Sequence, residues 1–185
     1  MRQLRSVSLG AAIAAIVAGT ALGARPASAA FSLPCLWNPF GCSVTFVSPE
    51  YAARPVQKLD PQKALDLVNA FRTANGLKAL TLDDRLCHAA AAQSKDQAVH
   101  SAIGHYGSDG STPMQRAERA GYHAKIASEN VASGEKSFGD ALNIWKDSSG
   151  HRANLLRPNV DAIGVGMAKN SSGRPYWTLV LGAEQ

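Results

Sequence analysis

The pattern that most restricts the fold lies at the end of the chain. The segment DAIGVGMAKNSSGRPYWTLVLG, residues 161–182, holds two β-rich runs on either side of a short Asn-Ser-Ser-Gly sequence at 170–173. Polar residues and glycine between two such runs are the signature of a β-hairpin. We therefore expect the chain to close with two antiparallel strands, on which the preceding elements pack.

Helical patterns come first along the chain. Asp60 can cap a helix that begins at Pro61, and apolar residues then recur at helical spacing as far as a stop at Gly76. A second helix is expected after Asp83, with a narrow face of small residues that indicates close packing against another element. The small residues on this face are Cys87, Ala90, Ala91, Ser94 and Ala98.

Two more helices and a β-like patch lie between these patterns and the hairpin. Thr112 and Gln115 match a capping box with Pro113 in the first turn, and this helix should end near Gly121. The β-like patch covers residues 126–131. The last helix has Ser137 as its cap and an apolar face of Phe138, Ala141, Leu142 and Trp145. Helices followed by a terminal hairpin predict an α+β fold, with helices packed on a small sheet.

The N-terminal residues have the layout of a secretory signal peptide. Arg2 and Arg5 give a basic start, an apolar run covers residues 9–22, and the sequence ASA at 27–29 is a small-x-small cleavage signal. The apolar run is shorter than the ~20 residues that a membrane-spanning helix needs. We therefore expect a signal peptide over residues 1–29, and a secreted or periplasmic protein with no transmembrane anchor after cleavage.

Residues 30–59 are expected to form an N-terminal arm or linker before a domain that covers residues 60–185. Four prolines interrupt this arm, and it shows no helical period. Cys35 and Cys42 bracket the turn-forming segment CLWNPFGC, which favours a disulfide between them in an oxidising compartment. Cys87 has no such partner and is expected to be a buried small hydrophobe.

The charge balance gives no support for a nucleic-acid partner. The chain has 19 Lys and Arg against 14 Asp and Glu, and three of the arginines lie in the expected signal peptide, so 16 basic residues face 14 acidic ones. Nucleic-acid binding depends on clustered neutralisation of phosphates, and no block of five or six like charges occurs here. The sequence also has no phosphate-binding loop of either common type.

Three polar residues are candidates for chemistry: His105 in a Gly-rich loop, Glu129 in the β-like patch and His151 after the last helix. Each has an ordinary alternative, as an exposed loop residue, an ion-pair partner or a helix cap. Two histidines and a carboxylate are also the ligand types of an open zinc site. A serine hydrolase built on Ser148 and His151 lacks the nucleophile elbow and an orienting acid, and the HExxH motif of zinc peptidases is absent.

The order and spacing of several motifs resemble the CAP superfamily, which takes in cysteine-rich secretory proteins, antigen 5 and pathogenesis-related 1 proteins. The motifs are LVNAFRTANGLKALTLDDRL, GHYGSDGSTPMQRAERAGY, SENVASG, WKDSSGHRANLL, IGVGMA and YWTLVLG. The resemblance is closest to the bacterial SCP-domain branch and covers about residues 60–185. It implies an α-β-α sandwich with a small central antiparallel sheet.

The resemblance also implies a surface cavity lined by two histidines and two acidic residues. His105 and His151 match the histidines, and Glu129 matches the acid of the family's Gly-Glu-Asn motif. Ser148 stands where the family usually has its second acid, and Ser128 stands where it usually has glycine. The expected cavity therefore comprises His105, Glu129, Ser148 and His151, and a divalent metal such as Zn would be held by His105 and His151.

These residues favour binding over catalysis. Acid–base catalysis usually needs paired groups whose pKa values are separated, and Ser148 removes one of them. We therefore expect a secreted, non-enzymatic module that binds a small lipid-like or cell-envelope ligand, or a protein partner. The alternative is a divalent-metal-assisted hydrolase or peptidase that uses the same cavity.

Overall fold

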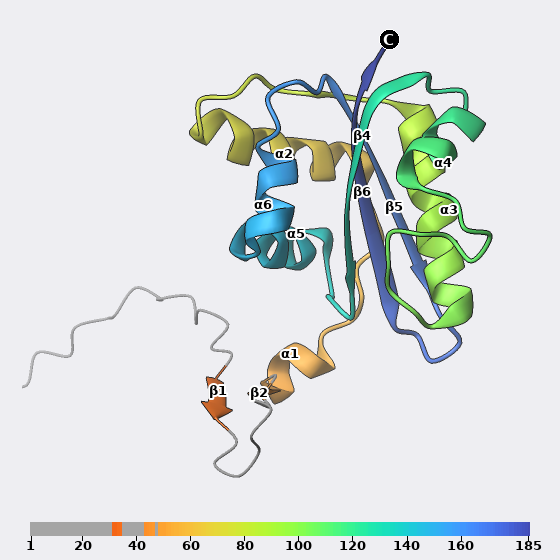
Figure 1. Ribbon diagram of the computed structural model, residues 1–185. Coiled ribbons are helices and arrows are strands. Elements are labelled where there is room, and N and C mark those ends of the chain that lie inside the picture. Colours follow the sequence, from red (N-terminus) through yellow and green to blue (C-terminus); the bar gives the residue numbers. More distant parts are fainter. Residues whose placement is uncertain (1–30, 35–42, 47) are drawn as a thin grey trace, which may run out of the picture. The chain divides into compact units, whose positions relative to one another are not determined.

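The structure, a computed structural model, describes residues 31–34, 43–46 and 48–185 (Figure 1). The expected signal peptide, and the disulfide expected between Cys35 and Cys42, lie outside the described residues.

The chain forms two units, Met1–Ala53 and Arg54–Gln185. In the first unit, β1 (Phe31–Pro34) pairs with β2 (Ser43–Phe46) in antiparallel register, and α1 covers Pro49–Ala53. All the candidate residues lie in the second unit.

A four-stranded sheet forms the centre of the second unit, with strand order β3-β5-β6-β4. Its members are β3 (Thr81–Leu82), β4 (Ala124–Ser133), β5 (Ala162–Lys169) and β6 (Pro175–Glu184). The predicted hairpin is confirmed, because β5 and β6 pair antiparallel around residues 170–173. β4 adds to β6 in antiparallel register. The sheet departs from a purely antiparallel one at β3, whose two residues pair parallel with β5.

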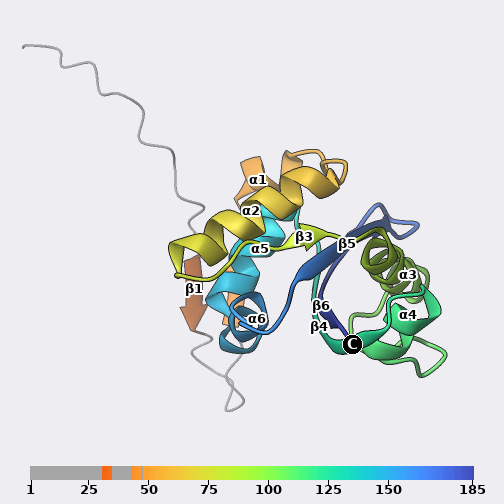
Figure 2. The ribbon, with the colours of Figure 1, turned by 90° about the horizontal axis from the view of Figure 1, so that it is seen from above.

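Helices cover both faces of this sheet, which confirms the α+β fold class and the α-β-α sandwich (Figures 1 and 2). One face carries α3 (Asp84–His100) and α4 (Pro113–Arg119). The other face carries α2 (Pro61–Ala74), α5 (Phe138–Asp147) and α6 (Ser149–Leu155). α6 has no counterpart among the helices predicted from the sequence.

Side-chain caps fix the starts of the four predicted helices. The caps are Asp60 for α2, Asp83 for α3, Thr112 for α4 and Ser137 for α5. At α4 the complete capping box forms, because Thr112 Oγ1 accepts from the Gln115 backbone N–H and Gln115 Oε1 accepts from the Thr112 backbone N–H. Such caps satisfy N–H groups that have no partner inside the helix.

The face that α3 buries is wider than the one predicted. Ala90, Ser94 and Ala98 are buried as expected, but Ala91 is exposed and Cys87 is partly buried. The structure also buries four residues outside the predicted stripe: Leu86, Ala89, Gln93 and Gln97. The difference arises because α3 contacts β5 and β6 on one side and α4 on another, so a single narrow stripe cannot serve both contacts.

Two glycines of β5 allow α3 to lie directly on the sheet. A Cβ atom at Gly164 would lie 2.0 Å from the backbone carbon of Leu86, and one at Gly166 would lie 2.4 Å from that of Ala90. Ile163 and Val165 alternate with these glycines and belong to the core on the opposite face. The Ile-Gly-Val-Gly sequence therefore presents bare backbone to α3 and branched side chains to the other helical layer.

The larger core lies between the sheet and the layer of α2, α5 and α6. Trp145 and Trp177 are fully buried there, and their indole N–H groups donate to the carbonyl oxygens of Val131 and Glu135 at 3.0 and 2.9 Å. The apolar face predicted for α5 is confirmed, because the four residues assigned to that face are all buried.

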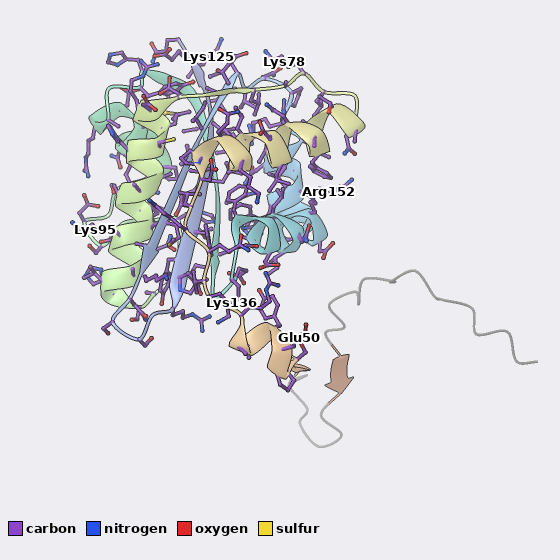
Figure 3. All side chains as sticks on the ribbon, turned by 180° about the vertical axis from the view of Figure 1, so that it is seen from behind. Glu50, Lys78, Lys95, Lys125, Lys136 and Arg152 are labelled. Carbon is purple, nitrogen blue, oxygen red and sulfur yellow. The ribbon has the colours of Figure 1, made fainter. Side chains whose placement is uncertain are left out.

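A buried arginine ties α6 to α2. Arg72 of α2 is fully buried, and its Nη1 donates to the carbonyl oxygens of Leu155 at 2.7 Å and Arg157 at 2.9 Å. Arg152 of α6, which is labelled in Figure 3, adds a second link. Its guanidinium lies 5.0 Å from the centre of the Phe71 ring of α2. These contacts hold α6, and with it His151, in place.

Candidate functional site

The candidate residues gather at β4, which forms one edge of the sheet. Glu129 lies in the middle of this strand and is 4% exposed. Its Oε1 accepts from Nδ1 of His105 at 3.0 Å, and its Oε2 accepts from Nη2 of Arg116 at 2.7 Å. His105 and Glu129, which were both expected to line one cavity, are therefore in direct contact, and both carboxylate oxygens of Glu129 accept hydrogen bonds.

Arg116 is the site residue that the sequence reasoning missed. This α4 side chain is 6% exposed, and besides Glu129 it binds the carbonyl oxygens of His105 at 3.1 Å and Ser111 at 2.6 Å. It therefore holds the loop that carries His105 at two points, His105 itself and Ser111. The capping box placed Arg116 in the first turn of a helix, but no local pattern links it to a strand thirteen residues further on.

His151 reaches the same edge from the opposite helical layer. Glu129 and Asn130 are neighbours in β4, so their side chains point to opposite faces of the sheet. Asn130 Nδ2 donates to the carbonyl oxygen of His151 at 3.0 Å. Asn154 Nδ2 donates to the carbonyl oxygen of Glu129 at 3.1 Å and to Oδ1 of Asn130 at 2.9 Å. These amides hold α6 against the strand.

Ser148 occupies the N-cap position of α6, and its side chain makes no capping hydrogen bond to that helix. It is partly buried. A hydroxyl at this position can donate or accept a hydrogen bond, but it cannot carry the charge that a carboxylate would bring.

The pKa values of the two histidines are shifted in opposite directions. The hydrogen bond to Glu129 raises the pKa of His105, whose side chain is 49% exposed. Burial lowers the pKa of His151, and the charge of His105 lowers it further. The Nδ1 atom of His151 is buried and has no hydrogen-bond partner within the described residues. The site therefore favours one protonated imidazole, at His105, beside a neutral one at His151.

We expect NMR titration of the histidine ring protons to show His105 losing its proton above pH 6.5 and His151 losing its proton below it. The substitution Glu129→Gln should lower the pKa of His105, and His105→Asn should raise that of His151. The raised pKa of His105 stabilises the folded state at low pH, and this contribution is lost as the pH rises through the folded pKa. The lowered pKa of His151 destabilises the folded state at low pH, and this effect disappears as the pH rises. Titration of both rings at one common pH would contradict this description.

The donor set does not fit a zinc site with three protein ligands. Within the described residues, no group of three or more His, Cys, Asp or Glu side chains is arranged to hold a metal ion. The Glu129 carboxylate accepts hydrogen bonds from His105 and Arg116, and a serine replaces the second acid. An open zinc site normally has three protein ligands. The side chains at this edge of the sheet therefore fall short of that number.

A cavity of about 470 Å³ lies beside this site, between α3, α4 and the loop that joins them. Arg116 belongs to both, whereas the other residues of the cavity wall come from α3, α4 and its C-cap Ala120, and residues 107–111. We call it the α3–α4 cavity. It differs from the cavity expected from the sequence, which combines His105 with His151.

Exposed apolar side chains stand next to His105. Ile103 is 53% exposed and Tyr106 is 72% exposed, and Val99, at the end of α3, is 70% exposed. On the other helical layer, Ile144 of α5 is 48% exposed. Single exposed apolar residues are common, but three within residues 99–106, which include His105, make this segment a candidate contact surface.

The model of the Cysteine-rich secretory protein (CAP) family matches residues 65–181. Uncharacterized protein YkwD of Bacillus subtilis is 35% identical over 117 residues, which are 63% of this chain and 44% of that protein. Uncharacterized membrane protein YlbC of the same organism is 27% identical over 68% of this chain and 35% of its own length. The chain thus spans less than half the length of either relative.

Solved structures show the same fold. An extracellular protein with an SCP domain from Bacillus anthracis superposes with a TM-score of 0.62 at 27% identity, over 67% of this chain and 40% of the other. An outer surface protein from Borrelia burgdorferi gives a TM-score of 0.61 at 23% identity, over 70% of this chain and 98% of the other. The match to the family model includes every candidate site residue.

Proposed function

Because the chain belongs to the cysteine-rich secretory protein (CAP) family, as its motifs predicted, we propose that it is an extracytoplasmic binding module rather than an enzyme. Its ligand is an amphiphilic, lipid-like molecule with an anionic head group. The head group binds at His105, and the apolar part lies on Ile103 and Tyr106.

The hydrogen bonding and burial of Glu129 are the main reason to propose binding rather than catalysis. A general base needs a free carboxylate oxygen or nitrogen within reach of the substrate. Both oxygens of Glu129 instead accept hydrogen bonds, from His105 and Arg116, and the side chain is almost completely buried. Glu129 is therefore a positioning residue, which orients the His105 ring and stabilises its protonated form.

The surroundings of His105 support an anionic amphiphile. Glu129 raises the pKa of His105, so its half-exposed ring can carry a positive charge near neutral pH. Ile103 and Tyr106 flank it in the same loop and are more than half exposed. A charged donor beside exposed apolar side chains matches a molecule with an acidic head and a hydrocarbon tail.

The extracytoplasmic location rests on two supports. The expected signal peptide would direct the chain to export. The Bacillus anthracis protein with the same fold is described as extracellular. Among the described residues, no helix is long and apolar enough to cross a membrane.

Binding of cis-parinaric acid, a fluorescent fatty acid, tests the proposal. We expect the double variant Ile103→Ser/Tyr106→Ser to weaken binding by at least about tenfold, since two apolar contacts are lost. Ile144→Ser removes an exposed apolar side chain of similar exposure from the other helical layer and should leave the affinity unchanged.

Three results would contradict the proposal. The protein could fail to bind the fatty acid at all, or Ile144→Ser could weaken binding as much as the double variant. Hydrolysis of an ester or peptide that requires a divalent metal and is lost in His151→Ala would instead support the enzymatic alternative.

A further inference from the structure

The α3–α4 cavity has a wall of small apolar and polar residues. Its wall includes Ala89, Ala92 and Ala120, which we call the alanine floor. With a volume of about 470 Å³ it falls in the range of pockets that enclose small molecules. Ala92 lines it and is exposed, so the cavity is reached from solvent.

Two buried polar side chains of the wall have unused hydrogen-bonding atoms. Gln93 is fully buried and donates through Nε2 to the carbonyl oxygen of Gly104 at 2.7 Å, while its Oε1 has no partner within the described residues. Arg116 makes several hydrogen bonds through its terminal nitrogens, but its Nε is buried without a partner in the same part of the chain. Buried polar atoms are normally paired, and these two belong to residues of the cavity wall, where a ligand with hydroxyl or amide groups can offer both a donor and an acceptor.

Most charged side chains at the cavity wall already have an oppositely charged partner or hydrogen-bond donors. Asp109 pairs with Arg119, and both side chains are more than half exposed. Asp96 accepts hydrogen bonds from the backbone N–H of Ser108 at 2.9 Å and from its hydroxyl at 2.6 Å. Arg116 is neutralised by Glu129, which does not line the cavity. An anionic ligand would therefore have to displace Glu129 from Arg116 or Asp109 from Arg119, whereas a neutral polar ligand would not.

Carboxylates, a guanidinium and an amide around the alanine floor suit a neutral molecule with many hydroxyl groups. Each hydroxyl both donates and accepts a hydrogen bond, so it can bridge Asp109 and Arg119 without separating them. The carbon-bound hydrogens of a sugar ring give it an apolar face that can pack on alanine. We propose that the α3–α4 cavity binds a neutral saccharide unit, a hexose or N-acetylhexosamine.

Two neighbouring alanines of α3 provide a matched test. Ala92 lines the cavity and Ala91 does not, and both are exposed. The substitution Ala92→Phe fills the cavity without removing a polar group, and Ala91→Phe adds the same ring outside it. The probes are glucose, N-acetylglucosamine and its disaccharide at millimolar concentration, with the zwitterion glycylglycine as comparison. Binding is followed by backbone amide shifts in NMR spectra of the purified protein.

We expect at least one of the neutral sugars to shift amides of residues 88–96, 107–111 and 116–120. Ala92→Phe should weaken this binding by at least about tenfold, whereas Ala91→Phe should retain it within about twofold. The proposal is overturned if no sugar shifts these amides, if glycylglycine does so instead, or if Ala92→Phe binds as well as the unchanged protein. Both variants leave Ile103 and Tyr106 in place, so fatty-acid binding is measured independently of this result.

Discussion

The substitution Gly164→Ala is expected to lower the free energy of unfolding by about 3 kcal/mol, the upper part of the usual range for overpacking a core. The added Cβ would lie 2.0 Å from the Leu86 carbon and 2.2 Å from the Cys87 nitrogen. Both are backbone atoms of α3, so no side-chain rotation can relieve the contact. The helix must move away from the sheet or the strand must distort.

Urea unfolding followed by tryptophan fluorescence measures this effect, because Trp145 and Trp177 are fully buried. Gly150→Ala serves as the control: it lies in α6, where an added Cβ meets no atom within 4 Å. Alanine is a better helix former than glycine, so this variant should be neutral or more stable by up to about 1 kcal/mol. Equal unfolding midpoints for Gly164→Ala and the unchanged protein would show that α3 does not pack on β5 as described.

Much of the fold could be predicted because its signals are local. The caps at Asp60, Asp83, Thr112 and Ser137 each act within a few residues, and the hairpin depends on the few residues between its strands. The Ile-Gly-Val-Gly sequence is recognisable as part of a family motif. The glycines are needed because α3 lies in close contact with β5. This contact joins residues far apart in the chain, so no local sequence pattern predicts it.

Tertiary contacts account for what was missed. α6 is seven residues long and begins without a side-chain cap, so its sequence gives no strong helical signal. It is held by Arg72 from α2 and by Asn130 from β4. The predicted buried face of α3 was too narrow for the same reason. The spacing of residues within α3 does not reveal that α4 packs on a second side of this helix.

The candidate site was predicted in part. His105 and Glu129 do meet, and Asn130, the next residue of β4, binds the carbonyl oxygen of His151, so the three residues share one edge of the sheet. The contribution of Arg116 could not be foreseen, since it joins α4 to β4 across a turn. This arginine changes the interpretation of Glu129 from a free acid to one half of a buried ion pair.

That ion pair leads to the second large effect. Glu129→Ala is expected to lower the free energy of unfolding by about 3–5 kcal/mol, because it leaves Arg116 charged, buried and unpaired. The side chains of Arg116 and Glu129 are 6% and 1% exposed, so little water solvates the charge of Arg116 once the carboxylate is removed. Asp147→Ala removes an exposed acid from the end of α5 and should change the stability by less than about 0.5 kcal/mol.

A second substitution separates the lost ion pair from a simple packing defect. If the unpaired charge of Arg116 causes the loss, then Glu129→Leu/Arg116→Met should be more stable than Glu129→Leu alone, because apolar residues of similar volume can replace a buried ion pair. If packing around Glu129 causes it, the second substitution should destabilise the protein further. In both variants the ring of His105 loses its carboxylate partner, so its pKa should fall. Recovery of stability without recovery of that pKa would show that stability depends on pairing the charge of Arg116, whereas the raised pKa of His105 depends on the Glu129 carboxylate.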